Sequence, residues 1–127
     1  MTILVIDDSS VMRRIHSNML LEHGVAQSFI REAADGKEAL AIAQATPVSL
    51  FLVDWNMPKL DGLEFVKAIR AMPTYTSTPI IMITSEAAKY NVMDAINAGV
   101  TNYVVKPIKG DALWKKISLH LEVGAGK

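Results

Sequence analysis

Short apolar runs recur along the chain, and each has the length of a strand rather than of a helix. They cover residues 3–6, 29–33, 48–53, 80–83 and 103–105. Four of them are nearly continuous in Ile, Val, Leu, Met and Phe, which is typical of parallel strands covered on both faces. The run at 29–33 also holds Arg31 and Glu32. We therefore expect that strand at an edge of the sheet.

Segments with helical spacing of apolar residues separate these runs. The first places Val11, Ile15 and Met19 at i, i+4 and i+8 and ends at Gly24, a typical helix stop. Further helices are expected over residues 36–45, 62–72, 87–98 and 109–121. Strict alternation of strands and helices predicts an α/β fold, with a doubly wound parallel sheet and helices on both faces.

Length and composition fit this interpretation. The chain has 127 residues, and half of them are hydrophobic. A chain of that size and apolar content forms one packed domain and is not intrinsically disordered. We expect a single domain over residues 1–127, with residues 122–127 as a loose tail.

Charge and cysteine content narrow the possible functions. Thirteen basic and thirteen acidic side chains give a net charge of zero, which provides no overall field to attract nucleic acid or an anionic membrane. The absence of cysteine excludes disulfides, thiolate metal sites and a cysteine nucleophile. Neither a secretory signal nor an apolar run of membrane-spanning length is recognisable. We expect a cytoplasmic monomer that binds neither nucleic acid nor membrane.

Chemically active side chains follow the expected strands, where ligands bind in open α/β sheets. Asp7 and Asp8 follow the first run, Asp54 the third, Thr84 the fourth and Lys106 the fifth. Converging carboxylates repel one another unless a cation joins them, and Mg²⁺ favours such oxygen ligands together with phosphate. Lys106 and Thr84 can supply a positive charge and a hydroxyl to phosphate oxygens.

Asp54 is the best candidate for a nucleophile because it stands alone after the strand expected at the centre of the sheet. A carboxylate that attacks phosphorus forms an acyl phosphate. Phosphoryl transfer needs positioning and charge neutralisation, both of which this residue set provides. Capping of the first helix by residues 7–10 is the alternative interpretation of the acids after the first strand.

Together these residues resemble the receiver domain of bacterial response regulators over nearly the whole chain, and most of all its single-domain chemotaxis members. The resemblance is carried by Asp7-Asp8, Asp54-Trp55-Asn56-Met57-Pro58, Asp61-Gly62, Thr84-Ser85-Glu86 and Tyr103-Val104-Val105-Lys106-Pro107. It implies a flavodoxin-like sheet with strand order 2-1-3-4-5 and five helices.

The resemblance also implies a role for each acid. Asp54 would be the phosphoacceptor. Mg²⁺ would bind the side chains of Asp8 and Asp54 and the main-chain carbonyl of Asn56, with Asp7 acting through a water molecule.

The remaining roles concern the phosphoryl group and its signal. Thr84 and Lys106 would contact the phosphoryl group, and Tyr103 would rotate when Thr84 moves, which changes the surface of the fourth helix, fifth strand and fifth helix. Asn56 and Glu86 would tune self-dephosphorylation by controlling the access of water.

The implied function is a signalling phosphoacceptor, not a metabolic enzyme, that catalyses its own phosphorylation and dephosphorylation. Its partners would be a histidine kinase, an output protein such as a flagellar motor switch component, and a phosphatase. A stand-alone phosphorelay intermediate, a phosphate sink and a receiver fragment of a larger regulator remain open.

Three other classes fit less well. A haloacid dehalogenase-type phosphatase carries its nucleophile in a DxD motif after the first strand, whereas Asp7 and Asp8 are adjacent. An FMN-binding flavodoxin needs a loop there that receives phosphate, which these acids repel. A degenerate receiver that binds partners without phosphorylation is disfavoured because the acids, Thr84 and Lys106 are all retained.

Overall fold

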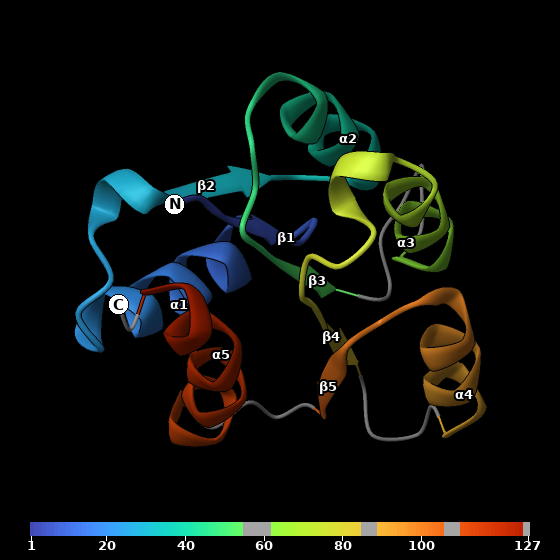
Figure 1. Cartoon of the computed structure of the whole chain (residues 1–127). Coiled ribbons are helices and arrows are strands. Elements are labelled where there is room, and N and C mark those ends of the chain that lie inside the picture. Colours follow the sequence, from blue (N-terminus) through green and yellow to red (C-terminus); the bar gives the residue numbers. More distant parts are fainter. Residues whose placement is uncertain (55–61, 85–88, 106–109, 126–127) are drawn as a thin grey trace.

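The computed structural model describes residues 1–54, 62–84, 89–105 and 110–125. Within these ranges lies a sheet of five parallel strands in the order β2-β1-β3-β4-β5 (Figure 1). The strands are β1 (Ile3–Ile6), β2 (Ile30–Ala33), β3 (Leu50–Asp54), β4 (Ile80–Thr84) and β5 (Asn102–Val105). The predicted fold class and strand order are confirmed, with β2 at an edge and β3 at the centre.

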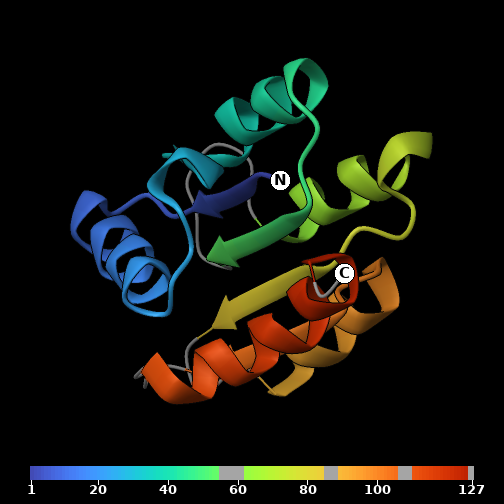
Figure 2. The ribbon, with the colours of Figure 1, turned by 60° about the vertical axis from the view of Figure 1, so that its left-hand side comes forward.

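Helices cover both faces of the sheet, as the two views in Figures 1 and 2 show. They are α1 (Ser10–Glu22), α2 (Gly36–Ala45), α3 (Gly62–Arg70), α4 (Lys89–Ala98) and α5 (Gly110–Ala125), with short 3-10 helices η1 (Gln27–Phe29) and η2 (Pro73–Tyr75). One face packs against α1 and α5, and the other against α2, α3 and α4. No helix within the described ranges combines the length and apolar character needed to cross a membrane.

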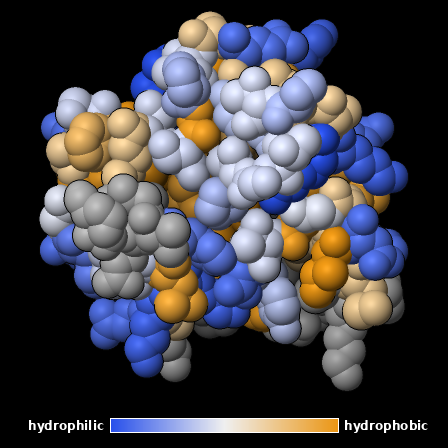
Figure 3. Space-filling model, viewed as in Figure 1, coloured by the Kyte–Doolittle hydropathy of each residue, from blue (hydrophilic) through white to orange (hydrophobic). Residues whose placement is uncertain are grey.

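Alternate strand residues fill two separate cores, which is why the strands are nearly continuous in apolar residues. The core beneath α1 and α5 contains Ile3, Val5, Leu50, Leu52, Ile81 and Ile83. The core beneath α2, α3 and α4 contains Leu4, Ile6, Phe51, Val53, Ile80 and Met82. Over the face shown in Figure 3, by contrast, apolar residues are scattered among polar ones.

The apolar residues whose spacing predicted the first helix do not all lie on its buried face. Val11 is 66% exposed and Ile15 is 48% exposed, whereas Met19 is buried. The face of α1 turned toward the sheet instead includes His16 and Leu20. Apolar spacing identified the helix correctly, but polar residues share its buried face, so the spacing did not give its rotation.

Two predicted ends of elements also differ. The strand expected from residue 29 begins at Ile30, because Gln27–Phe29 form η1. The last helix extends to Ala125, so residues 122–125 are helical where a loose tail was predicted. Gly124 lies within this helix, where a glycine costs only about 1 kcal/mol relative to alanine.

A partly buried network of hydrogen bonds joins segments at the amino-terminal ends of the strands. Arg70, at the end of α3, donates to the carbonyl oxygens of Gly99, Tyr75 and Thr78 at 2.7–3.0 Å, and to Thr101 Oγ1 at 3.3 Å. Burial lowers the pKa of the Arg70 guanidinium from its ordinary value. A guanidinium nevertheless stays protonated in proteins, so Arg70 remains a charged donor.

Candidate functional site

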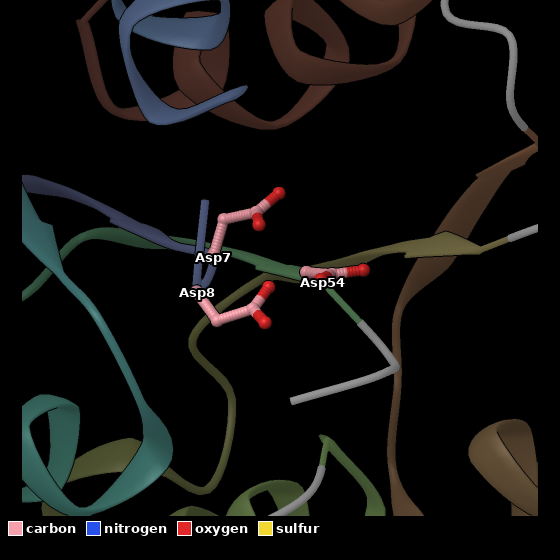
Figure 4. Close-up of side chains that lie close together, drawn as sticks. All are labelled: Asp7, Asp8 and Asp54. Atoms are coloured by element: carbon pink, nitrogen blue, oxygen red, sulfur yellow. The ribbon is translucent and has the colours of Figure 1, made fainter. Parts of the chain in front are cut away.

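Strand register brings the acids together. Ile6 lies opposite Val53 in the parallel pair of β1 and β3, so Asp7 and Asp54 occupy the next position along each strand. Asp8 extends from the same end of β1. Figure 4 shows the three side chains directed toward the same side of the strand ends. One carboxylate oxygen from each of Asp7, Asp8 and Asp54 lies within 4.8 Å of the others.

The three acids differ in their surroundings. Asp7 is 1% exposed and Asp54 is 3% exposed, whereas Asp8 is exposed. The Ser9 N–H donates a hydrogen bond to Asp7 Oδ1 at 2.9 Å, and the Asp7 N–H donates to the Ala33 carbonyl oxygen at 3.1 Å. We call Asp7, Asp8 and Asp54 the acid cluster. Hydrogen bonds hold Asp7 in place, and Asp8 is open to solvent.

Helix capping does not account for the acid cluster. The N-cap of α1 is Ser9, whose side chain accepts the N–H of Met12 at 3.2 Å. Asp7 contributes a contact to Ser9 N–H, one residue before the helix starts. The capping alternative thus applies to Ser9, and the carboxylates of Asp8 and Asp54 remain to be explained.

The electrostatics of the acid cluster favour a bound cation. Two ionised carboxylates whose oxygens lie within 4.8 Å of each other repel by at least about 3 kcal/mol at an effective dielectric constant of about 20. A hard divalent ion with oxygen ligands converts this repulsion into attraction, and it can keep water on its exposed side. Asp7, Asp8 and Asp54 therefore fit Mg²⁺ in ligand type and arrangement.

The other predicted site residues lie at the same edge of the sheet or outside the described residues. Thr84 ends β4 opposite Val105, the last residue of β5, so its main chain lies at the carboxyl-terminal edge with Asp54. Lys106, Asn56 and Glu86 lie outside the described residues. Their predicted roles stay predictions.

Tyr103 occupies β5 with its side chain half-buried against the core beneath α2, α3 and α4. The Lys116 Nζ from α5 lies 4.8 Å from the centre of the Tyr103 ring and donates to the Tyr103 carbonyl oxygen. An aromatic ring attracts a cation that lies over its face, and the attraction is stronger where water is excluded. The ring is thus held between the core and a basic side chain.

Sequence reasoning missed two residues beside the acid cluster. Arg13 of α1 donates from Nη1 to the Asp7 carbonyl oxygen at 2.6 Å, and its Nε lies 3.0 Å from Glu32 Oε1 on β2. Arg31 and Glu32 marked β2 as a polar edge strand, but nothing in their spacing connects Glu32 to a helix 19 residues earlier. That connection depends on the pairing of β1 with β2.

Comparison with known proteins identifies the family of the chain. Residues 3–118 match the family model of the response regulator receiver domain. The chain belongs to the response regulator receiver domain family.

Within that family the chain is similar to CheY chemotaxis proteins. The chemotaxis protein CheY homolog of Campylobacter jejuni subsp. jejuni (serotype O:23/36, strain 81-176) is 43% identical over 128 residues, covering 100% of this chain and 97% of that protein. CheY1 of Helicobacter pylori (strain J99) is 43% identical over 95% of this chain and 97% of that protein. The structure of Vibrio cholerae CheY4 matches with a TM-score of 0.85 and 36% identity, covering 94% of this chain and 97% of that one.

Proposed function

We propose that this chain is a phosphoacceptor receiver of a two-component system, in which a histidine kinase donates a phosphoryl group to Asp54. The phosphorylated form then binds an output protein, as a CheY-like regulator of the flagellar motor. The observation that carries the proposal is the acid cluster: Asp7 and Asp8 meet Asp54 at the carboxyl end of the central strand. Membership of the receiver family and 43% identity to CheY homologues support it.

The proposed chemistry is two phosphoryl transfers. A carboxylate oxygen of Asp54 attacks phosphorus, the P–N bond to the kinase histidine breaks, and the departing imidazole takes up a proton. Water later attacks the same phosphorus, the bond to the Asp54 oxygen breaks, and inorganic phosphate leaves a restored carboxylate. Bound Mg²⁺ would neutralise charge on the carboxylates and the phosphoryl oxygens.

The ligands of Mg²⁺ in this proposal are the side chains of Asp8 and Asp54 and the main-chain carbonyl of Asn56. Asp7 acts through a water molecule. The exposure of Asp8 supports its place among the direct ligands, since an exposed carboxylate can meet an ion that arrives from solvent.

The proposed signal passes from the phosphoryl group to the surface. The Lys106 ammonium neutralises one phosphoryl oxygen, and the Thr84 hydroxyl donates to another. The movement of Thr84 frees space for the Tyr103 ring, which changes the surface of α4, β5 and α5. Asn56 and Glu86 control the access of water and so the lifetime of the phosphoryl group.

We further propose that the chain acts in the cytoplasm as a monomeric single domain over residues 1–127. Its partners are the kinase, a flagellar motor switch component and a phosphatase. A phosphate sink or a relay intermediate would use the same acid cluster and would differ only in its output partner.

The decisive experiment uses acetyl phosphate as donor and intact-mass spectrometry as readout. The wild-type protein is expected to gain one phosphoryl group with Mg²⁺ and none in EDTA, and Asp54→Asn is expected to gain none. Asp111→Asn, which removes a fully exposed carboxylate, serves as the matched control and should behave as wild type. Mg²⁺-dependent phosphorylation of Asp54→Asn at the wild-type rate would refute the assignment.

The role of Thr84 is tested separately with ¹⁹F-labelled tyrosine. Phosphorylation is expected to shift the Tyr103 resonance in wild type, whereas Thr84→Ala should be phosphorylated with that resonance unchanged. Tyr75, buried near the opposite edge of the sheet, provides an internal control in the same spectrum. An equal Tyr103 shift in both proteins would contradict the proposed coupling.

A further inference from the structure

Asp7, which lies just beyond the end of β1, is held by three hydrogen bonds. Its N–H donates to the Ala33 carbonyl at 3.1 Å, and its Oδ1 accepts the Ser9 N–H at 2.9 Å. Its carbonyl oxygen accepts Arg13 Nη1 at 2.6 Å. Because the Asp7 carbonyl belongs to the peptide that carries Asp8, the contact with Arg13 fixes the main chain between the two acids.

Arg13 is itself oriented by the neighbouring strand. Its Nε lies 3.0 Å from Glu32 Oε1, and Glu32 Oε2 accepts the Ser17 hydroxyl at 3.3 Å. The Arg13 side chain is 17% exposed and that of Glu32 is 44% exposed. Two different nitrogens of one planar guanidinium thus bind Glu32 and Asp7, and lysine lacks this fixed fork of donors.

We propose that Arg13, oriented by Glu32, is a positioning residue for the binding of Mg²⁺ at the acid cluster. This inference rests on the proposed function. The like charges of Asp7, Asp8 and Asp54 favour separation, so the segment that carries the first two acids needs an external anchor to keep them converged. Arg13 and Glu32 supply that anchor before the ion arrives, which lowers the cost of ordering the site on binding.

A second mode of action predicts no change in Mg²⁺ affinity when Arg13 is replaced by lysine. If Arg13 acted only through its charge, it would repel Mg²⁺, and lysine at the same position would repel it equally. Positioning depends on the shape of the guanidinium, because its flat fork joins two acceptors. Replacement by lysine keeps the charge and removes the fork, so it separates the two modes.

The test compares Arg13→Lys with Arg14→Lys, a matched change on the exposed neighbour in α1. Mg²⁺ is titrated at 25 °C and 0.15 M salt, with tryptophan fluorescence and calorimetry as readouts. We expect Arg13→Lys to raise the Mg²⁺ dissociation constant roughly threefold to tenfold, which is less than the roughly tenfold to hundredfold for direct partners of metal ligands, because Arg13 contacts the Asp7 main chain. Arg14→Lys should match wild type, and thermal unfolding in EDTA should show both variants folded at the titration temperature.

Glu32→Gln provides a second variant at an exposed position that tolerates substitution. It should weaken Mg²⁺ binding in the wild-type background and add little in an Arg13→Lys background, because Glu32 acts through Arg13. Unchanged affinity in Arg13→Lys, or full additivity of the two changes, would overturn the inference. If wild type failed to bind Mg²⁺ at all, the proposed function would fall as well, so the two failures are distinguishable.

Discussion

Two arginines at opposite edges of the same sheet bind main-chain carbonyl groups with different consequences. Arg13 lies at the carboxyl-terminal edge, where it holds the Asp7 carbonyl beside the acid cluster. Arg70 lies at the amino-terminal edge, where it joins the end of α4 to the segment before β4. Both side chains donate to main-chain carbonyl oxygens that lie next to the ends of strands or helices. The same kind of contact thus stabilises the fold at the amino-terminal ends of the strands and, in our proposal, positions the acids at the carboxyl-terminal ends.

The difference follows from what surrounds each guanidinium. The acceptors around Arg70 are neutral carbonyl oxygens, so the charge of the guanidinium only strengthens these hydrogen bonds. Near Arg13 the bound main chain carries carboxylates that repel one another. Substitutions at the Arg70 edge should therefore change the free energy of unfolding and leave Mg²⁺ affinity unaltered, whereas Arg13→Lys should do the reverse.

The largest effect is expected for Arg70→Ala. It leaves the carbonyls of Gly99, Tyr75 and Thr78 without their charged donor, and we expect the free energy of unfolding to fall by about 3 kcal/mol. Urea unfolding in EDTA measures this loss, and a Mg²⁺ titration below the melting temperature checks that affinity is retained. A tenfold loss of Mg²⁺ affinity in folded Arg70→Ala would break the contrast between the two edges.

Tyr75→Phe should have the next largest effect. The buried Tyr75 hydroxyl lies 2.7 Å from the Ala43 carbonyl and 3.0 Å from that of Thr46, and it accepts the Val48 N–H at 3.2 Å. Removal of the oxygen leaves these main-chain groups unsatisfied and should cost about 2 kcal/mol. Tyr103→Phe, which alters a half-buried tyrosine, is the control. Equal costs for the two variants in urea would show that burial of the hydroxyl bonds adds nothing.

Asp54→Asn should stabilise the protein without divalent ions. Removal of one of three like charges relieves repulsion in the acid cluster, and we expect a gain of about 1 kcal/mol in EDTA. Mg²⁺ at ten times its dissociation constant should stabilise wild type by about 1.4 kcal/mol and the variant much less. Asp111→Asn should show neither change. Loss of stability in Asp54→Asn in EDTA would argue that the acids do not repel.

The smallest expected effect is the difference in stability cost between alanine substitutions at two glycines with positive φ. Gly24 (φ +93°) and Gly99 (φ +118°) both end helices, and alanine is strained at either position. A Cβ at Gly99 would also lie 2.9 Å from Arg70 Cγ, whereas a Cβ at Gly24 meets nothing within 4 Å. Gly99→Ala should therefore cost roughly 0.5–1 kcal/mol more than Gly24→Ala. That excess should vanish in an Arg70→Ala background.

Most of the fold could be predicted from the sequence because its strands are buried on both faces. Continuous apolar runs marked β1, β3 and β4, and the acids that follow β1 and end β3 marked the candidate site. The alternation of elements then required a parallel sheet. Asp54 could be placed on the central strand through the family resemblance, which supplied the strand order.

The missed features depend on contacts between distant segments. Val11 and Ile15 have the spacing of a buried face, yet the face of α1 toward the sheet contains His16. An arginine on a helix is usually solvated, so the tie from Arg13 to Glu32 becomes visible only once β1 and β2 are paired. Such links follow from register and rotation, which the apolar pattern alone does not determine.

The central claim is that the acid cluster is a cation site that enables phosphorylation of Asp54. The most direct test measures how Trp55 fluorescence and the phosphorylation rate each depend on the Mg²⁺ concentration. Trp55 follows Asp54 in the sequence, and Trp114→Phe leaves it as the sole tryptophan. Its fluorescence gives the Mg²⁺ concentration for half-saturation, and the rate of phosphorylation by acetyl phosphate gives a second midpoint. The account predicts that the two midpoints coincide, and that Asp8→Asn shifts both together to higher Mg²⁺. A phosphorylation rate independent of Mg²⁺, or unchanged in Asp8→Asn, would contradict it.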